Sequence, residues 1–174
     1  MSDAQRIVIR IKKNKDGRIS LSCTRADGTT TWQRQEGGQA RFFPRHDLTH
    51  YAVETVLGHC KGFYGLVAAG WDLSDFGTPW PRGRLPKDAN LSEIIVGFLD
   101  RERASGELWT AAALNDQLAS FAGENTLPLP EKISEDHLAR IRERRAELFA
   151  QWDAVEPGEA LELPFDLSPE PVHK

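Results

Sequence analysis

The chain has 174 residues, of which 40% are hydrophobic and 28% are charged, and this favours a single domain (1–174) with its own core. A formal net charge of −4 gives no global positive field that would attract nucleic acid, so we expect no nucleic-acid partner. We also expect no membrane span, since no apolar stretch has the required length. The first residues lack the apolar run of a signal peptide, which predicts a cytoplasmic protein.

Residues 6–36 have the pattern of an antiparallel three-stranded meander. Apolar and polar side chains alternate in the first two segments, and Asp16-Gly17 and Asp27-Gly28 separate the three. Asp-Gly between alternating segments is a strong hairpin signal, because glycine tolerates a positive φ. A two-residue loop at Asp27-Gly28 would place Cys23 opposite Trp32, with both on the apolar face.

The part from 44 to 152 is predicted to be mainly helical, interrupted by an irregular loop over 72–90. We expect helices over 44–57, around 63–69, from Asn90 to about 103, over roughly 107–121, and from Ser134 to 152. Leu161, Leu163 and Phe165 alternate with other residues, so 158–166 is a possible edge strand. The predicted fold class is α+β: an N-terminal meander, a possible C-terminal edge strand and a cover of about four helices, with loose termini.

The segment over 44–57 carries the most informative residues. On a helix, His46, Asp47, His50 and Glu54 fall within one arc of about 100°. Histidines four residues apart lie one turn above each other on the same face. Such a pair can bind one metal ion, so we predict a divalent metal site, preferably for zinc, at His46 and His50.

Geometry limits the remaining ligands. His46 and Glu54 are two turns apart, about 12 Å along the axis, and cannot both bind one ion. Either both histidines bind with a third ligand from elsewhere, or His50 pairs with Glu54 while Asp47 or His46 supports it. A catalytic zinc site needs three protein ligands and an open position. The candidates for the third ligand are His59, His137, Asp72, Asp75 and Glu93.

The His-Asp-x-x-His pentad resembles the His-Glu-x-x-His motif of zinc proteases, with Asp47 in place of the general-base glutamate. It also resembles the zinc motif of the coenzyme Q biosynthesis protein family, which places a glutamate farther downstream, where this chain has Gly62. The longer stretch from Pro44 to Glu54, followed by Gly62-Phe-Tyr-Gly-Leu, resembles an uncharacterised bacterial protein family with a His-Asp-Leu-x-His-x-x-Val-Glu helix. That resemblance spans about the middle third of the chain and implies no assigned activity.

Two functions follow from these residues. In the first, the protein is a metal-dependent hydrolase of unassigned substrate, in which Asp47 or Glu54 acts as the catalytic group that moves protons or orients an imidazole. In the second, the protein is a non-catalytic ligand-binding or protein-interaction domain, and the His/Asp/Glu face is a structural polar network. The aromatic residues near the long loop, Trp71, Phe76 and Trp80, either anchor it on the core or line a pocket beside the histidines.

Overall fold

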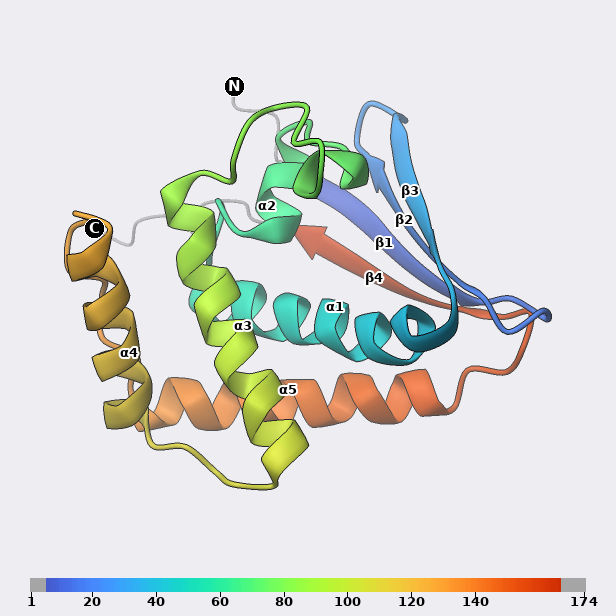
Figure 1. The fold of residues 1–174 in the computed structure, drawn as a ribbon. Helices are drawn as coiled ribbons and strands as arrows, with labels where there is room; N and C mark the ends of the chain where they lie inside the picture. Colours follow the sequence, from blue (N-terminus) through green and yellow to red (C-terminus); the bar gives the residue numbers. More distant parts are fainter. Residues whose placement is uncertain (1–5, 167–174) are drawn as a thin grey trace, which may run out of the picture.

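The computed structural model describes residues 6–166 and contains one antiparallel sheet (Figure 1). The strands are β1 (Arg6–Lys13), β2 (Ile19–Arg25), β3 (Thr30–Gln35) and β4 (Ala160–Asp166), in the order β3-β2-β1-β4. The predicted meander is confirmed. The possible strand over 158–166 is confirmed as β4, an edge strand that pairs with β1.

One face of the sheet forms part of the hydrophobic core, as the alternation predicts. Ile7, Ile9 and Ile11 of β1 are fully buried, and Leu163 and Phe165 of β4 lie opposite Ile9 and Ile7. Residues between them point to the other face, which is more exposed. Period-two burial on one face is the expected arrangement for an antiparallel sheet with a single covered side.

The predicted pairing of Cys23 with Trp32 is wrong. Cys23 lies opposite Thr31, and Trp32 lies opposite Ser22 with 60% of its surface exposed. The cause is the length of the loop: the Arg25 amide donates to the Thr29 carbonyl, which leaves three residues in the turn instead of two. A shift of one residue moves every side chain of a strand to the opposite face.

Five α-helices and one short 3-10 helix complete the described part of the chain. α1 lies against the sheet, α5 runs along the side of α1 that faces away from it, and α3 crosses both (Figure 1). No helix within residues 6–166 is long and apolar enough to cross a membrane. The helices are α1 (Gly37–Leu57), α2 (Phe63–Ala68), η1 (Leu73–Phe76), α3 (Lys87–Ser105), α4 (Ala111–Glu124) and α5 (Glu135–Asp153).

Three helix starts differ from the prediction. α1 begins at Gly37, so Pro44 lies inside the helix rather than in its first turn. α3 begins at Lys87 after Pro86, and Asn90 lies inside the helix instead of capping it. The chain between Gly106 and Thr110 is not helical, and α4 starts only after Thr110, whose hydroxyl accepts from the Ala113 amide. The predicted cap of α5 is confirmed: the Ser134 hydroxyl accepts from the His137 amide.

Candidate metal centre

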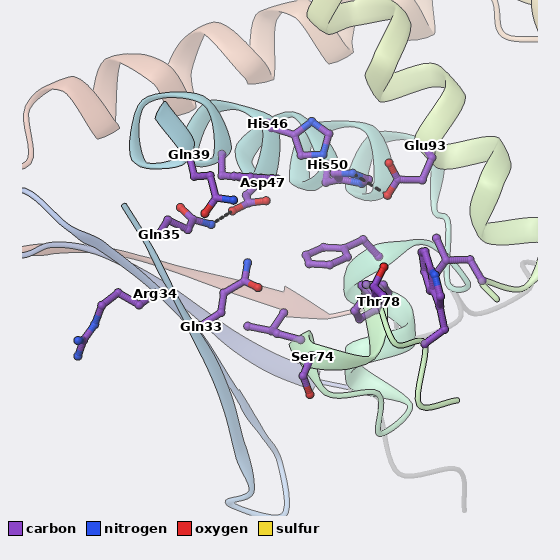
Figure 2. Close-up of a pocket in the computed structure, with 17 residues that line it drawn as sticks. Gln33, Arg34, Gln35, Gln39, His46, Asp47, His50, Ser74, Thr78 and Glu93 are labelled. Atoms are coloured by element: carbon purple, nitrogen blue, oxygen red, sulfur yellow. Dashed lines mark hydrogen bonds and ion pairs between the residues drawn. The ribbon is translucent and has the colours of Figure 1, made fainter. Parts of the chain in front are cut away.

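Three side chains from two crossing helices converge beside the sheet. His46 and His50 come from α1 and Glu93 from α3, and one potential ligand atom from each lies within 4.8 Å of the others. Figure 2 shows both imidazoles on the side of α1 that faces Glu93. His50 Nε2 is 3.1 Å from Glu93 Oε1. Two imidazoles and one carboxylate are a ligand set that zinc and iron(II) sites use.

His46 is held by a carboxylate on its other side. Its Nδ1 lies 2.7 Å from Oδ2 of Asp100, which is two turns along α3 from Glu93. Both side chains are mostly buried, with 18% and 13% of their surfaces exposed. This contact fixes the ring orientation, and it leaves Nε2 as the ring nitrogen that can bind an ion. Metal-binding histidines commonly have such a carboxylate partner.

His50 has an equivalent partner within its own helix. Its Nδ1 lies 3.2 Å from Oε2 of Glu54, and both side chains are almost completely buried. The other carboxylate oxygen, Oε1, accepts the backbone N–H groups of Tyr64 at 3.0 Å and Gly65 at 3.4 Å, at the start of α2. Glu54 is therefore fixed from both sides, and it orients the imidazole of His50 rather than facing a ligand.

Gly62 lies directly against this carboxylate. A Cβ atom at position 62 would be 2.3 Å from Oε1 of Glu54, so any side chain at this position would displace the Glu54 carboxylate. The coenzyme Q biosynthesis family has a glutamate at this position of its motif. In this chain the carboxylate that approaches the two histidines comes instead from Glu93 of α3, about thirty residues farther along.

The carboxylates around His50 determine its charge without a metal. Burial favours the neutral imidazole, but the hydrogen bonds and charges of Glu54 and Glu93 outweigh it and raise the pKa of His50 to about 10. Burial raises the pKa of Glu54, although His50 opposes this effect. For Glu93, burial acts in the same upward direction, but the bond from His50 outweighs it and leaves the pKa below its usual range. His50 and Glu93 thus form an ion pair at neutral pH.

Asp47 occupies a separate position next to this cluster. Only 3% of the surface of Asp47 is exposed, and the Gln35 side-chain amide donates a hydrogen bond to its Oδ2 at 3.3 Å. Burial raises the pKa of Asp47 to about 6, although the nearby His46 and His50 act in the opposite direction. An acid with a pKa close to neutrality is suited to proton transfer.

The cluster opens into a cavity of about 620 Å³. His46, His50 and Glu93 line one part of it, and Asp47 lines it as well, whereas Glu54 does not. Figure 2 shows the wall opposite α1, where Gln33 and Gln35 of β3 reach toward the helix and Arg34 points away from it. The remaining wall comes mainly from the predicted irregular loop and from aromatic side chains: Phe43, Phe63, Phe76 and Trp80. Of the three aromatic residues predicted near this site, Trp71 is the one that does not line the cavity.

The other residues predicted as candidates for the third ligand are not part of this group, and three of them contact other side chains. His59 Nδ1 is 2.8 Å from the Ser92 hydroxyl, and Asp72 and Asp75 form ion pairs with Arg25 and Arg82. Within residues 6–166, His137 does not belong to the group of His46, His50 and Glu93 either. The sequence pattern did not single out Asp100 or Gln35. The signal for Asp100 was its spacing of seven residues from Glu93, which places both carboxylates on one helix face.

No protein-family model, curated protein or solved structure matches this chain. The fold and the site therefore define the protein only as an α+β domain with a carboxylate-supported pair of histidines beside a cavity.

Proposed function

We propose that this protein binds one divalent metal ion, preferably zinc, through His46, His50 and Glu93, and that it acts as a metal-dependent hydrolase. The observation that carries the proposal is the convergence of these three groups at the wall of a cavity. His46 would bind through Nε2, because Nδ1 is held by Asp100. His50 would also bind through Nε2, with the metal replacing the proton that Glu93 now attracts.

The surroundings of the ligands support a metal more than they support an ordinary polar network. Each histidine contacts a different carboxylate through Nδ1, Asp100 for His46 and Glu54 for His50. Such contacts select the tautomer that presents Nε2 to a metal and make the imidazole a better donor. Three protein ligands next to an open cavity leave a coordination position for water or substrate, as in catalytic zinc sites.

The chemistry of such a site is hydrolytic when the substrate carries an electrophilic carbonyl. A divalent ion supplies a water of lowered pKa and polarises the carbonyl oxygen. Asp47 is the residue that we assign to accept and return the proton, because it lines the cavity next to His46 and His50. Glu54 is assigned a positioning role on His50, since it is fully buried and outside the cavity lining.

A second function is favoured by one specific observation. His50 lies between Glu54 and Glu93 with both ring nitrogens within 3.2 Å of a carboxylate, so its hydrogen bonds are satisfied without a metal. In that case the polar face stabilises the fold, and the cavity binds a ligand without chemistry. The two functions differ in whether the purified protein contains metal.

The test is elemental analysis of protein purified without a histidine tag. The wild type is compared with a His46→Ala/His50→Ala double variant and with Glu93→Gln. We expect near-stoichiometric zinc or another divalent metal in the wild type and loss of that metal in both variants. His59→Ala and His137→Ala are matched controls, because each removes a histidine that lies outside the group.

A metal-free wild type that also fails to bind added zinc would reject the proposal and favour the ligand-binding function. Retention of metal by the double variant would show that the ion is bound elsewhere. Loss of metal in His59→Ala would assign the third ligand to a different residue. Circular dichroism of each variant separates the loss of a ligand from the loss of the fold.

A further inference from the structure

We infer that the substrate of this cavity is an uncharged molecule with a planar ring and an amide-like polar group, and not a phosphorylated or carboxylated compound. The inference rests on the proposed function, because it takes the cavity beside the candidate metal centre as the substrate site. It is carried by the charges, the aromatic surfaces and the carboxamides that line the cavity.

The charges at the cavity disfavour an anionic ligand. Two carboxylates, Asp47 and Glu93, belong to its lining. Arg34 is the single lysine or arginine in the lining formed by the described residues, and its guanidinium lies 5.9 Å from the ring centroid of Trp32, an exposed residue. Figure 2 shows the Arg34 side chain directed away from the other lining residues. In the metal-free cavity, a phosphate or carboxylate group would therefore meet Asp47 and Glu93. The other cationic lining residue, His50, is already paired through both ring nitrogens with Glu54 and Glu93, so it is not free to bind an anion.

The aromatic side chains favour a flat ligand. Phe63 is close to His50, with ring centroids 5.3 Å apart, and Phe76 is 4.6 Å from Phe63. Trp80 also lines the cavity although 40% of its surface is exposed. Its backbone has a φ of 59°, in the left-handed region that a tryptophan seldom adopts. Such conformations cluster at ligand-binding sites, and an aromatic wall binds planar rings through stacked or edge contacts.

The polar wall is made largely of carboxamides. Gln33 and Gln35 come from β3 and Gln39 from the first turn of α1, and all three line the cavity. Figure 2 shows Gln35 and Gln39 beside Asp47, and Gln33 farther along β3 with its amide directed toward α1. A carboxamide offers both an N–H donor and a carbonyl acceptor. Side chains of this kind complement a neutral group that also has a donor and an acceptor, such as an amide.

The test uses three small probes that differ in one property each. Benzamide is neutral and flat, benzoate has nearly the same shape with a negative charge, and cyclohexanecarboxamide has the same amide on a non-planar ring. Each probe is titrated into ¹⁵N-labelled protein, zinc-free and zinc-loaded, and amide shifts are followed by NMR. We expect benzamide to bind about tenfold more tightly than benzoate or cyclohexanecarboxamide to the zinc-free protein. The shifts should map to residues that line the cavity.

Variants locate the binding. Trp80→Ala should weaken benzamide binding several-fold, and Trp32→Ala, which removes an exposed tryptophan outside the cavity lining, should leave it unchanged. Equal or tighter binding of benzoate, no preference for the flat ring, shifts away from the cavity, or no binding of any probe would each overturn the inference. Because the zinc-free protein is titrated too, a failure to bind zinc rejects the proposed function separately from this result.

Discussion

A Cβ atom at Gly62 would lie 2.3 Å from Oε1 of Glu54, the carboxylate that holds His50. The two residues belong to different segments, and their contact depends on the start of α2, where the Tyr64 and Gly65 amides donate to the same oxygen. The glycine at this position is therefore a steric requirement of the histidine cluster, and its substitution tests how the cluster is supported.

Gly62→Ala is expected to reduce zinc affinity by about 10- to 100-fold, because the added methyl group displaces Glu54 from His50. Isothermal titration of zinc into the metal-free protein measures the change. Gly123→Ala is the matched control: it adds the same methyl group in α4, where nothing lies within 4 Å. An unchanged affinity in Gly62→Ala would show that Glu54 does not support the site.

Asp100→Asn should weaken zinc binding by a similar factor of about 10 to 100, because His46 loses the negative charge that orients its ring. The substitution keeps the shape of the side chain, so we expect the fold to be retained. Asp116→Asn, on the exposed side of α4, is the control for the loss of one carboxylate. Equal zinc affinity of Asp100→Asn and wild type would argue against a metal bound through His46.

Acid should reduce the stability of the fold through Glu102. This carboxylate is almost fully buried and accepts bonds from Arg142, Arg145 and the Trp109 amide. Burial alone would raise the pKa of Glu102, but these partners outweigh it and lower the pKa below its ordinary value. The resulting stabilisation is present above the unfolded-state pKa, about 4.3, and is lost as the pH falls through the folded-state value.

Glu102→Gln is therefore expected to lower the free energy of unfolding by about 3 kcal/mol at neutral pH, since two arginines lose their buried partner. Urea unfolding at neutral and acidic pH should show the difference from wild type shrinking as the pH falls. Glu107→Gln, which changes an exposed side chain nearby, should have little effect. A difference that is constant across pH would mean that the ionised form of Glu102 does not stabilise the fold.

The two cysteines should react very differently. Cys23 is fully buried, and burial together with the nearby charge of Asp47 raises the pKa of its thiol to about 12. Cys60 is exposed, and both thiols are free. A thiol reagent such as dithionitrobenzoate should modify one cysteine quickly in the native protein and both after unfolding. Rapid modification of a native Cys60→Ser variant would contradict the packing of β2 against the core.

The sequence predicted those parts of the fold that depend on local patterns. Alternating residues define β1 and β4, and Ser134 marks the start of α5, because period-two burial and capping are read from neighbouring residues. The start of α1 was missed, since two glycines and Pro44 argue locally against a helix whose side chains pack against the core. The position of Trp32 was missed because it depends on one residue of loop length.

The residues of the candidate site also differ in whether a local pattern or a tertiary contact determines their position. His46 and His50 could be identified as a pair because their spacing on one helix is fixed by the geometry of α1. Glu93 was one of five open candidates for the third ligand, and nothing local distinguished it from His59 or Asp75. The approach of Glu93 to the two histidines depends on how α3 crosses α1, which is a tertiary contact between segments about forty residues apart.

X-ray absorption spectroscopy of the zinc-loaded, untagged protein identifies the atoms that bind the ion. We expect two imidazole nitrogens and oxygen ligands at about 2.0–2.2 Å, with no sulfur, and loss of the imidazole signal in the His46→Ala/His50→Ala variant. A sulfur ligand at about 2.3 Å would place the ion at a cysteine such as the exposed Cys60. That result, or a spectrum without histidine, would contradict a metal centre at His46, His50 and Glu93.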